Sequence, residues 1–175
     1  MVVYNELVAV TAGAGLLGFA AFLSHLLHKK PIDSEGWAAF FGITGTLLLA
    51  LGLHTTVTWP FGGDGFEYAN IAFGQPAAGF GALLLFAAIY LWRQRIRFSE
   101  DPETAYAAAV SAFKPVSIFV GALGLGMAVL AITFVRFQLG AAPPEEPISG
   151  RFGHLPIIEA LFLGGLWGVV AVGAL

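Results

Sequence analysis

The sequence contains no cysteine, and charged residues make up only 11% of its 175 positions. The absence of cysteine excludes disulfides, thiolate metal sites and cysteine nucleophiles, and it leaves the redox compartment open. A soluble domain carries about 25% charged residues, because most of its elements need a polar face. The low charge therefore excludes an ordinary soluble domain. Because the chain contains no basic tract, we expect no nucleic-acid partner.

The motifs that identify common enzymes are also missing. The segment 62–65 is glycine-rich, but no Lys-Ser or Lys-Thr follows it, so it does not predict a phosphate-binding loop. Neither the HExxH pattern of zinc proteases nor the GxSxG pattern of hydrolases occurs. Residues 1–6 carry no positive charge and so lack the first part of a cleavable secretory signal. We therefore expect a protein that is not an enzyme and whose first apolar run is a retained helix.

Hydrophobic residues, in contrast, make up 58% of the chain and form five long runs. A helix needs about 20 consecutive apolar residues to cross a hydrocarbon core about 30 Å thick. Tryptophan, tyrosine, proline and basic residues stand at the ends of these runs, as they do where helices leave a bilayer. The sequence thus predicts an all-α integral membrane bundle that forms one domain over residues 1–175. The five transmembrane helices are expected at residues 7–27, 37–59, 76–92, 116–135 and 155–175.

Two segments beside the expected spans are less apolar. Residues 67–75 are semi-polar and are expected to form a short interfacial or re-entrant piece before a helix that starts at Pro76. Residues 106–113 are alanine-rich and are expected to form an interfacial helix that leads into the fourth span. The segment 140–154 is too polar and too rich in proline and glycine to cross a membrane, so we expect a loop.

The orientation follows from the charges of the connections, because an excess of Lys and Arg marks the cytoplasmic side. The opposite side holds only Arg136 and Arg151 as basic residues. The first–second and third–fourth connections hold Lys29, Lys30, Arg93, Arg95, Arg97 and Lys114. We therefore expect a multi-pass protein of the cell membrane, with its N-terminus outside and its C-terminus inside.

Every expected span carries at least two glycines. Small residues let helix backbones approach closely in lipid, where no hydrophobic force drives helices together. We expect these glycines to pack helices within the chain. A face for other membrane subunits, or for a second copy in a homo-oligomer, is the alternative.

Ionisable groups in or beside membrane helices are costly, so each is a candidate site. His54 lies about one and a half turns inside the outer end of the second span, and Thr55 and Thr58 extend it into a polar patch. This histidine can carry protons or bind a metal, haem or quinone, or it can bond structurally to a neighbouring helix. His154 is the one histidine at matching depth for a bis-histidine haem, but it is expected in a loop. The metal and haem signal is therefore weak.

Glu159 lies one turn into the fifth span, and Arg136 ends the fourth span on the same side. The two can form a structural ion pair, and Glu6 at the start of the first span is a second possible partner for Arg136. The functional alternatives are an anion or headgroup site at Arg136 and a proton-carrying carboxylate.

Three stretches resemble a known family: residues 53–60, residues 70–76, and residues 136–139 together with the proline-rich 141–150. They look like an uncharacterised family of small prokaryotic membrane proteins, domain-of-unknown-function family 981. The resemblance covers most of the chain and implies a polytopic membrane fold. It implies no activity, so no catalytic residue transfers from it.

Our leading hypothesis is an accessory subunit or small-ligand binder with a polar site on its extracytoplasmic face. The candidate site residues are His54, Arg136, Glu159, Glu6, Thr58 and His154. One alternative is a membrane redox protein that binds haem or quinone near His54 and His154. The other is a channel or transporter for protons or ions, although five helices without an evident repeat are few for an alternating-access carrier.

Overall fold

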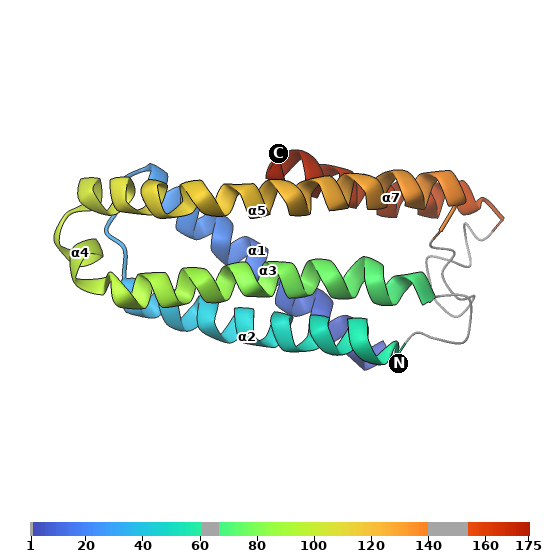
Figure 1. Cartoon of the computed structure of the whole chain (residues 1–175), viewed down its shortest axis with the longest axis horizontal. Helices are drawn as coiled ribbons and strands as arrows, with labels where there is room; N and C mark the ends of the chain where they lie inside the picture. The colour runs from blue at the N-terminus through green and yellow to red at the C-terminus, as the bar shows by residue number, and fades with distance from the viewer. Residues whose placement is uncertain (1, 61–66, 140–153) are drawn as a thin grey trace. The chain divides into compact units, whose positions relative to one another are not determined.

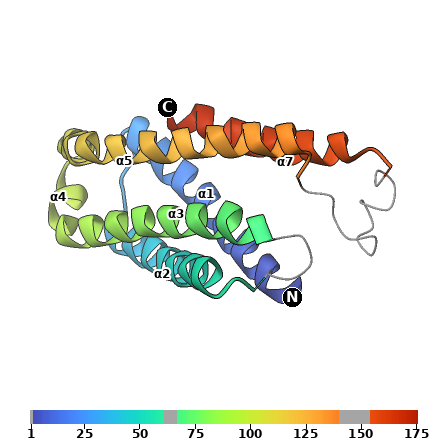
Figure 2. The ribbon, with the colours of Figure 1, turned by 45° about the vertical axis from the view of Figure 1, so that its right-hand side comes forward.

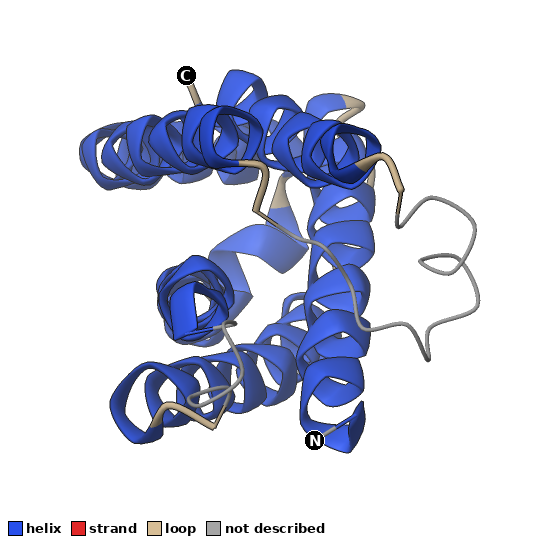
Figure 3. Ribbon diagram, turned by 90° about the vertical axis from the view of Figure 1, so that its right-hand side faces the viewer, coloured by secondary structure: helices blue, strands red, loops and turns tan. Residues whose placement is uncertain are grey.

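The structure is a computed structural model that describes residues 2–60, 67–139 and 154–175. Helices and loops, but no strands, make up this part of the chain, which confirms the predicted all-α fold (Figure 3). Five of the helices, all except the short α4, are long and apolar enough to cross a membrane. The helices are α1 (Val2–Leu27), α2 (Ser34–Thr58), α3 (Glu67–Arg93), α4 (Arg95–Glu100), α5 (Pro102–Phe137) and α7 (Pro156–Ala174).

The chain divides into two compact units, Met1–Phe113 and Lys114–Leu175. The first unit contains α1 to α4 and the first turns of α5. The second contains the rest of α5 and α7. The single transmembrane domain expected over residues 1–175 stays a prediction.

Two helices are longer than the sequence predicted, and each contains a proline. Helix α3 begins at Glu67 rather than at Pro76, and α5 begins at Pro102 and continues through Pro115. Proline lacks an amide proton and clashes with the preceding turn, so it usually ends a helix in water. Proline is tolerated inside apolar helices, because a broken helix would leave several backbone groups unpaired in hydrocarbon. Residues 67–75 belong to the continuous helix α3, which corrects their assignment as a separate piece before a helix that starts at Pro76. Residues 106–113 are helical and lead without a break into the fourth expected span, as predicted, and their interfacial position stays a prediction.

Glycines bring α2 and α3 into backbone contact. The two helices run antiparallel and side by side (Figures 1 and 2). A Cβ atom on Gly52 would stand 2.7 Å from the carbonyl oxygen of Gly74, and one on Gly81 would stand 2.9 Å from that of Gly45. Real Cβ atoms do not approach so closely, so only glycine fits at these positions. The glycines predicted to pack helices within the chain do so here, and they fix the register of α2 against α3.

Aromatic side chains complete the first unit. Phe22 of α1 and Phe41 of α2 are buried and meet edge to face, with ring centroids 5.5 Å apart. Trp37 stacks on Phe41 at 5.5 Å. At the C-terminal end of α3, the Tyr90 hydroxyl donates to the carbonyl of Ala108 at 2.9 Å and so joins α3 to the start of α5.

The second unit is a helix pair in which glycines also allow close contact between the two backbones. A Cβ atom on Gly164 of α7 would stand 3.0 Å from the carbonyl oxygen of Ala131 in α5, so the two backbones approach closely there. Near the other end of the pair, Gly124 contacts Ala174. Phe134 and Ala160 are buried between the helices. Helix α7 therefore runs back along α5.

Candidate functional site

Polar residues gather where α2 ends and α3 begins. We call His54, Thr55, Thr58 and Asn70 the His54 cluster. Helix α2 ends at Thr58 because the next residue, Trp59, adopts the left-handed conformation with φ of 50°. The glycine-fixed register brings the start of α3 beside this end of α2, since Thr56 contacts Gly74. Polar side chains that are far apart in the sequence thus lie at the same end of the helix pair.

His54 and Thr58 form a hydrogen-bonded couple one turn apart. The Thr58 hydroxyl donates to the carbonyl of His54 at 2.8 Å, which uses its only proton. The same oxygen lies 3.2 Å from Nδ1 of His54 and can therefore only accept from it. This geometry places a proton on Nδ1 of His54. In the neutral form of a ring protonated there, Nε2 is the acceptor and the nitrogen that can ligate a metal.

Thr55 and Asn70 form the buried part of the cluster. Both are almost fully inaccessible, at 3% and 0% exposure. Thr55 donates to the carbonyl of Leu51 at 2.8 Å, and the Asn70 amide donates to the carbonyl of Glu67 at 3.0 Å. These bonds satisfy polar groups that would be costly to bury alone. Their role is structural, and His54 and Thr58 are the exposed members that a ligand can reach.

Three of the other predicted site residues lie in the second unit, and the fourth, Glu6, has a side chain outside the described part of the structure. Arg136 is exposed in the last turn of α5, with its guanidinium 5.7 Å from the ring centroid of Phe137. Glu159 is half-buried in the first turn of α7, and His154 is exposed in the turn before it. Glu6 lies in α1, but its side chain is outside the described part.

His54 and Thr58 are the predicted pair that the structure brings together. The ion pairs of Arg136 with Glu159 or Glu6, and the haem pairing of His54 with His154, stay predictions. Among the described residues, no three His, Asp or Glu side chains are grouped to hold a metal ion. The proline-rich segment 141–150 lies outside the described residues.

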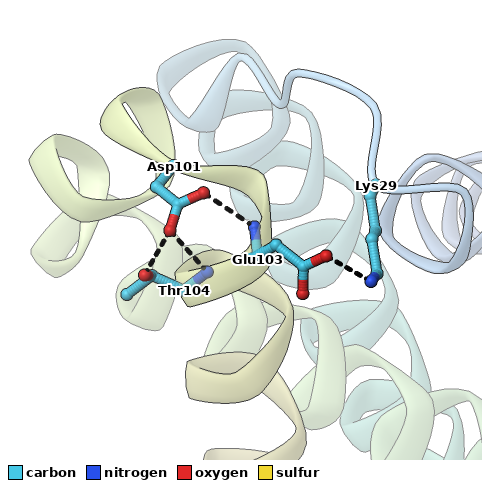
Figure 4. Close-up of polar contacts among 4 residues, drawn as sticks. All are labelled: Lys29, Asp101, Glu103 and Thr104. Atoms are coloured by element: carbon cyan, nitrogen blue, oxygen red, sulfur yellow. Dashed lines mark hydrogen bonds and ion pairs between the residues drawn. The ribbon is translucent and has the colours of Figure 1, made fainter.

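Sequence reasoning missed a set of paired charges at the opposite end of the first unit. Figure 4 shows the carboxylate of Glu103 in an ion pair with the ammonium of Lys29. Arg95 lies 3.6 Å from a carboxylate oxygen of Glu35, and its guanidinium lies over the ring of Trp92 at 5.0 Å. The sequence predicts these basic residues as markers of helix ends and of the cytoplasmic side, and not as partners in ion pairs. Lys29 and Glu103 are too far apart in sequence for any local pattern to reveal their contact.

Asp101 caps the start of α5 at this same end. Its carboxylate accepts from the Thr104 hydroxyl at 2.5 Å, and from the amide groups of Glu103 at 3.1 Å and Thr104 at 3.2 Å (Figure 4). The Thr104 hydroxyl first, and then the two amide groups, hold the pKa of Asp101 below its ordinary value of 3.8. The sequence does contain the signal, because an Asp before a Pro at the first helical position is a typical helix start.

Comparison with known proteins gives one match. The model of a family described as protein of unknown function (DUF981) matches residues 1–175. No curated protein and no solved structure matches the chain.

Proposed function

The chain belongs to the DUF981 family of unknown function, and we propose that it is a multi-pass protein of the cell membrane that binds a small ligand at the His54 cluster. Large apolar side chains on its long helices support the membrane assignment. Leu17 is 76% exposed, Ile118 78% and Val172 79%. Such side chains would be unfavourable in water and are favourable against lipid.

The couple of Thr58 with His54 carries the binding proposal. It holds the imidazole in one tautomer, with Nε2 as the acceptor. Ligating histidines commonly have their other ring nitrogen held by a second group in this way. A neutral imidazole acceptor favours a metal ion, a haem iron or a hydroxyl-bearing ligand such as a quinol. It is less suited to a quinone carbonyl, which needs a donor. The protein acts in this proposal as an accessory subunit or binding protein and not as an enzyme.

Charge distribution supports an extracytoplasmic site. In the first unit Lys29 and Lys30 follow α1, and Arg93 ends α3. His54 and Thr58 lie at the other end of α2, about six turns from its start along a helix of 25 residues. Because Lys and Arg favour the cytoplasmic side, the His54 end faces outside. In this orientation the N-terminus is outside and the C-terminus inside.

The test is binding of three defined probes to the purified protein: Zn²⁺, hemin and a short-chain ubiquinol. Visible absorbance follows hemin. Tryptophan fluorescence, to which Trp59 next to Thr58 contributes, follows the others. We expect at least one probe to bind and His54→Ala to weaken it by about tenfold or more, since one good hydrogen bond or ligand contributes about 1–3 kcal/mol.

Two threonine variants provide the matched comparison. Thr58→Val removes the hydroxyl that orients His54 and is expected to weaken the same probe. Thr46→Val is the control, because Thr46 makes the same kind of bond, to the carbonyl of Gly42 at 2.7 Å, far from the cluster. The proposal is wrong if His54→Ala binds as tightly as the wild type, or if none of the three probes binds.

A further inference from the structure

The C-terminal turns of α3 carry an open hollow of about 270 Å³. Its lining changes character along the helix. Phe86 and Ile89 form an apolar floor, Tyr90 forms a wall, and Arg93 and Gln94 lie at the polar end. Ligand pockets commonly measure about 300–1,000 Å³. The hollow therefore suits a headgroup and the first part of one acyl chain rather than a whole lipid.

The wall of the hollow is held in place by contacts on its far side. Tyr90 donates its hydroxyl proton to the carbonyl of Ala108, and its ring meets those of Phe98 at 6.0 Å and Phe113 at 6.4 Å. Phe86 stacks on Tyr90 at 6.2 Å and meets Phe113 edge to face at 5.8 Å. These contacts restrict the positions of both rings.

Two other basic residues at this end of the first unit are paired with carboxylates. Lys29 is paired with Glu103, and Arg95 is paired with Glu35. Among the described residues, no carboxylate lies within 4.0 Å of the exposed guanidinium of Arg93. Within the described part of the chain, its positive charge is therefore not neutralised by a carboxylate.

We infer that this hollow binds one anionic phospholipid. The lipid phosphate accepts hydrogen bonds from the Arg93 guanidinium, which matches phosphate geometry, and from the Gln94 amide. The acyl chain begins along Phe86 and Ile89, away from the polar end. Trp92, 54% exposed beside Arg93, is the kind of residue that marks the headgroup level of a bilayer. Basic pockets between or beside membrane helices are typical sites for such headgroups.

The experiment is native mass spectrometry of the full chain, transferred to micelles that contain equal amounts of phosphatidylglycerol and phosphatidylcholine. We expect the wild type to retain one phosphatidylglycerol in preference to phosphatidylcholine. Arg93→Ala is expected to lower this occupancy about tenfold, and Arg93→Lys to lower it less. Arg95→Ala is the matched control, since it removes the same charge from a residue that is already paired, and it should change occupancy less than twofold.

Two further arms test the site without relying on Arg93→Ala to fold. The variant Ile89→Trp fills the hollow while every charge remains, so this variant should bind less lipid. In the second arm, millimolar inorganic phosphate should not displace the lipid, because phosphate lacks an acyl chain. Equal retention of the two lipids by the wild type overturns the inference. So does an equal loss in Arg93→Ala and Arg95→Ala, or unchanged retention in Ile89→Trp.

Discussion

At the scale of single residues, polar side chains in this protein are held by the nearest backbone. The threonines of α2 donate to the carbonyl one turn before them, as Thr55 does to Leu51 and Thr58 does to His54. Such bonds satisfy a hydroxyl without a partner helix. One of them determines the contact with the imidazole, because the Thr58 hydroxyl donates its proton to the His54 carbonyl and its oxygen can then only accept from Nδ1.

Asp101 gives a prediction with a defined pH dependence. Its pKa is lower in the folded protein than the ordinary 3.8. A lowered pKa means that the carboxylate stabilises the fold above the unfolded pKa, and that this stability is lost as the pH falls through the folded pKa. Asp101→Ala should therefore lower the Tm of the detergent-solubilised protein at pH 7. The difference from wild type should shrink below pH 3.8 and then vanish, as measured by circular dichroism. An equal difference at every pH would show that the charge of Asp101 contributes nothing.

At the scale of elements, the α2–α3 pair depends on the absence of side chains at four positions. Gly81→Ala places a Cβ atom 2.4 Å from the backbone nitrogen of Leu49, so the helices must separate. Overpacking of this kind costs about 1–3 kcal/mol. We expect a matching loss of stability in detergent unfolding by SDS titration. Gly13→Ala is the control, because a Cβ atom on Gly13 meets nothing within 4 Å and alanine favours a helix. Equal stabilities of the two variants would contradict the close contact.

The helices also show which features of the fold can be predicted from the sequence. Apolar length is a local property, so five helices long enough to span were predictable, and so was the end of α1 at Leu27. The spacing of His54 and Thr58, one turn apart, placed them on one helix face. Pro76 misled the prediction, because proline favours the first turn of a helix, whereas α3 begins at Glu67 and contains Pro76 in its interior. The predicted fourth span begins after Pro115, whereas α5 continues through this proline. The contact of Lys29 with Glu103 depends on how helices pack, which no local pattern contains.

At the scale of the whole molecule, the two ends of the first unit carry different kinds of polar residue. One end of the first unit carries paired charges, a helix cap and the hollow at Arg93. The other end carries the His54 cluster. The proposed ligand site and the proposed lipid site are thus separate features on opposite ends of α3, and each has its own test. The central claim is that α2 crosses the membrane with its C-terminal end outside.

The most direct test of this claim uses the absence of cysteine, because any cysteine introduced into the chain is unique. Glu35 and Glu67 form a matched pair, since each is an exposed glutamate in the first turn of a helix, at opposite ends of the α2–α3 pair. In intact cells, a membrane-impermeant maleimide should label Glu67→Cys. It should label Glu35→Cys only after the membrane is permeabilised. Labelling of Glu35→Cys but not Glu67→Cys in intact cells would reverse the orientation, and labelling of both would show that α2 does not cross the membrane.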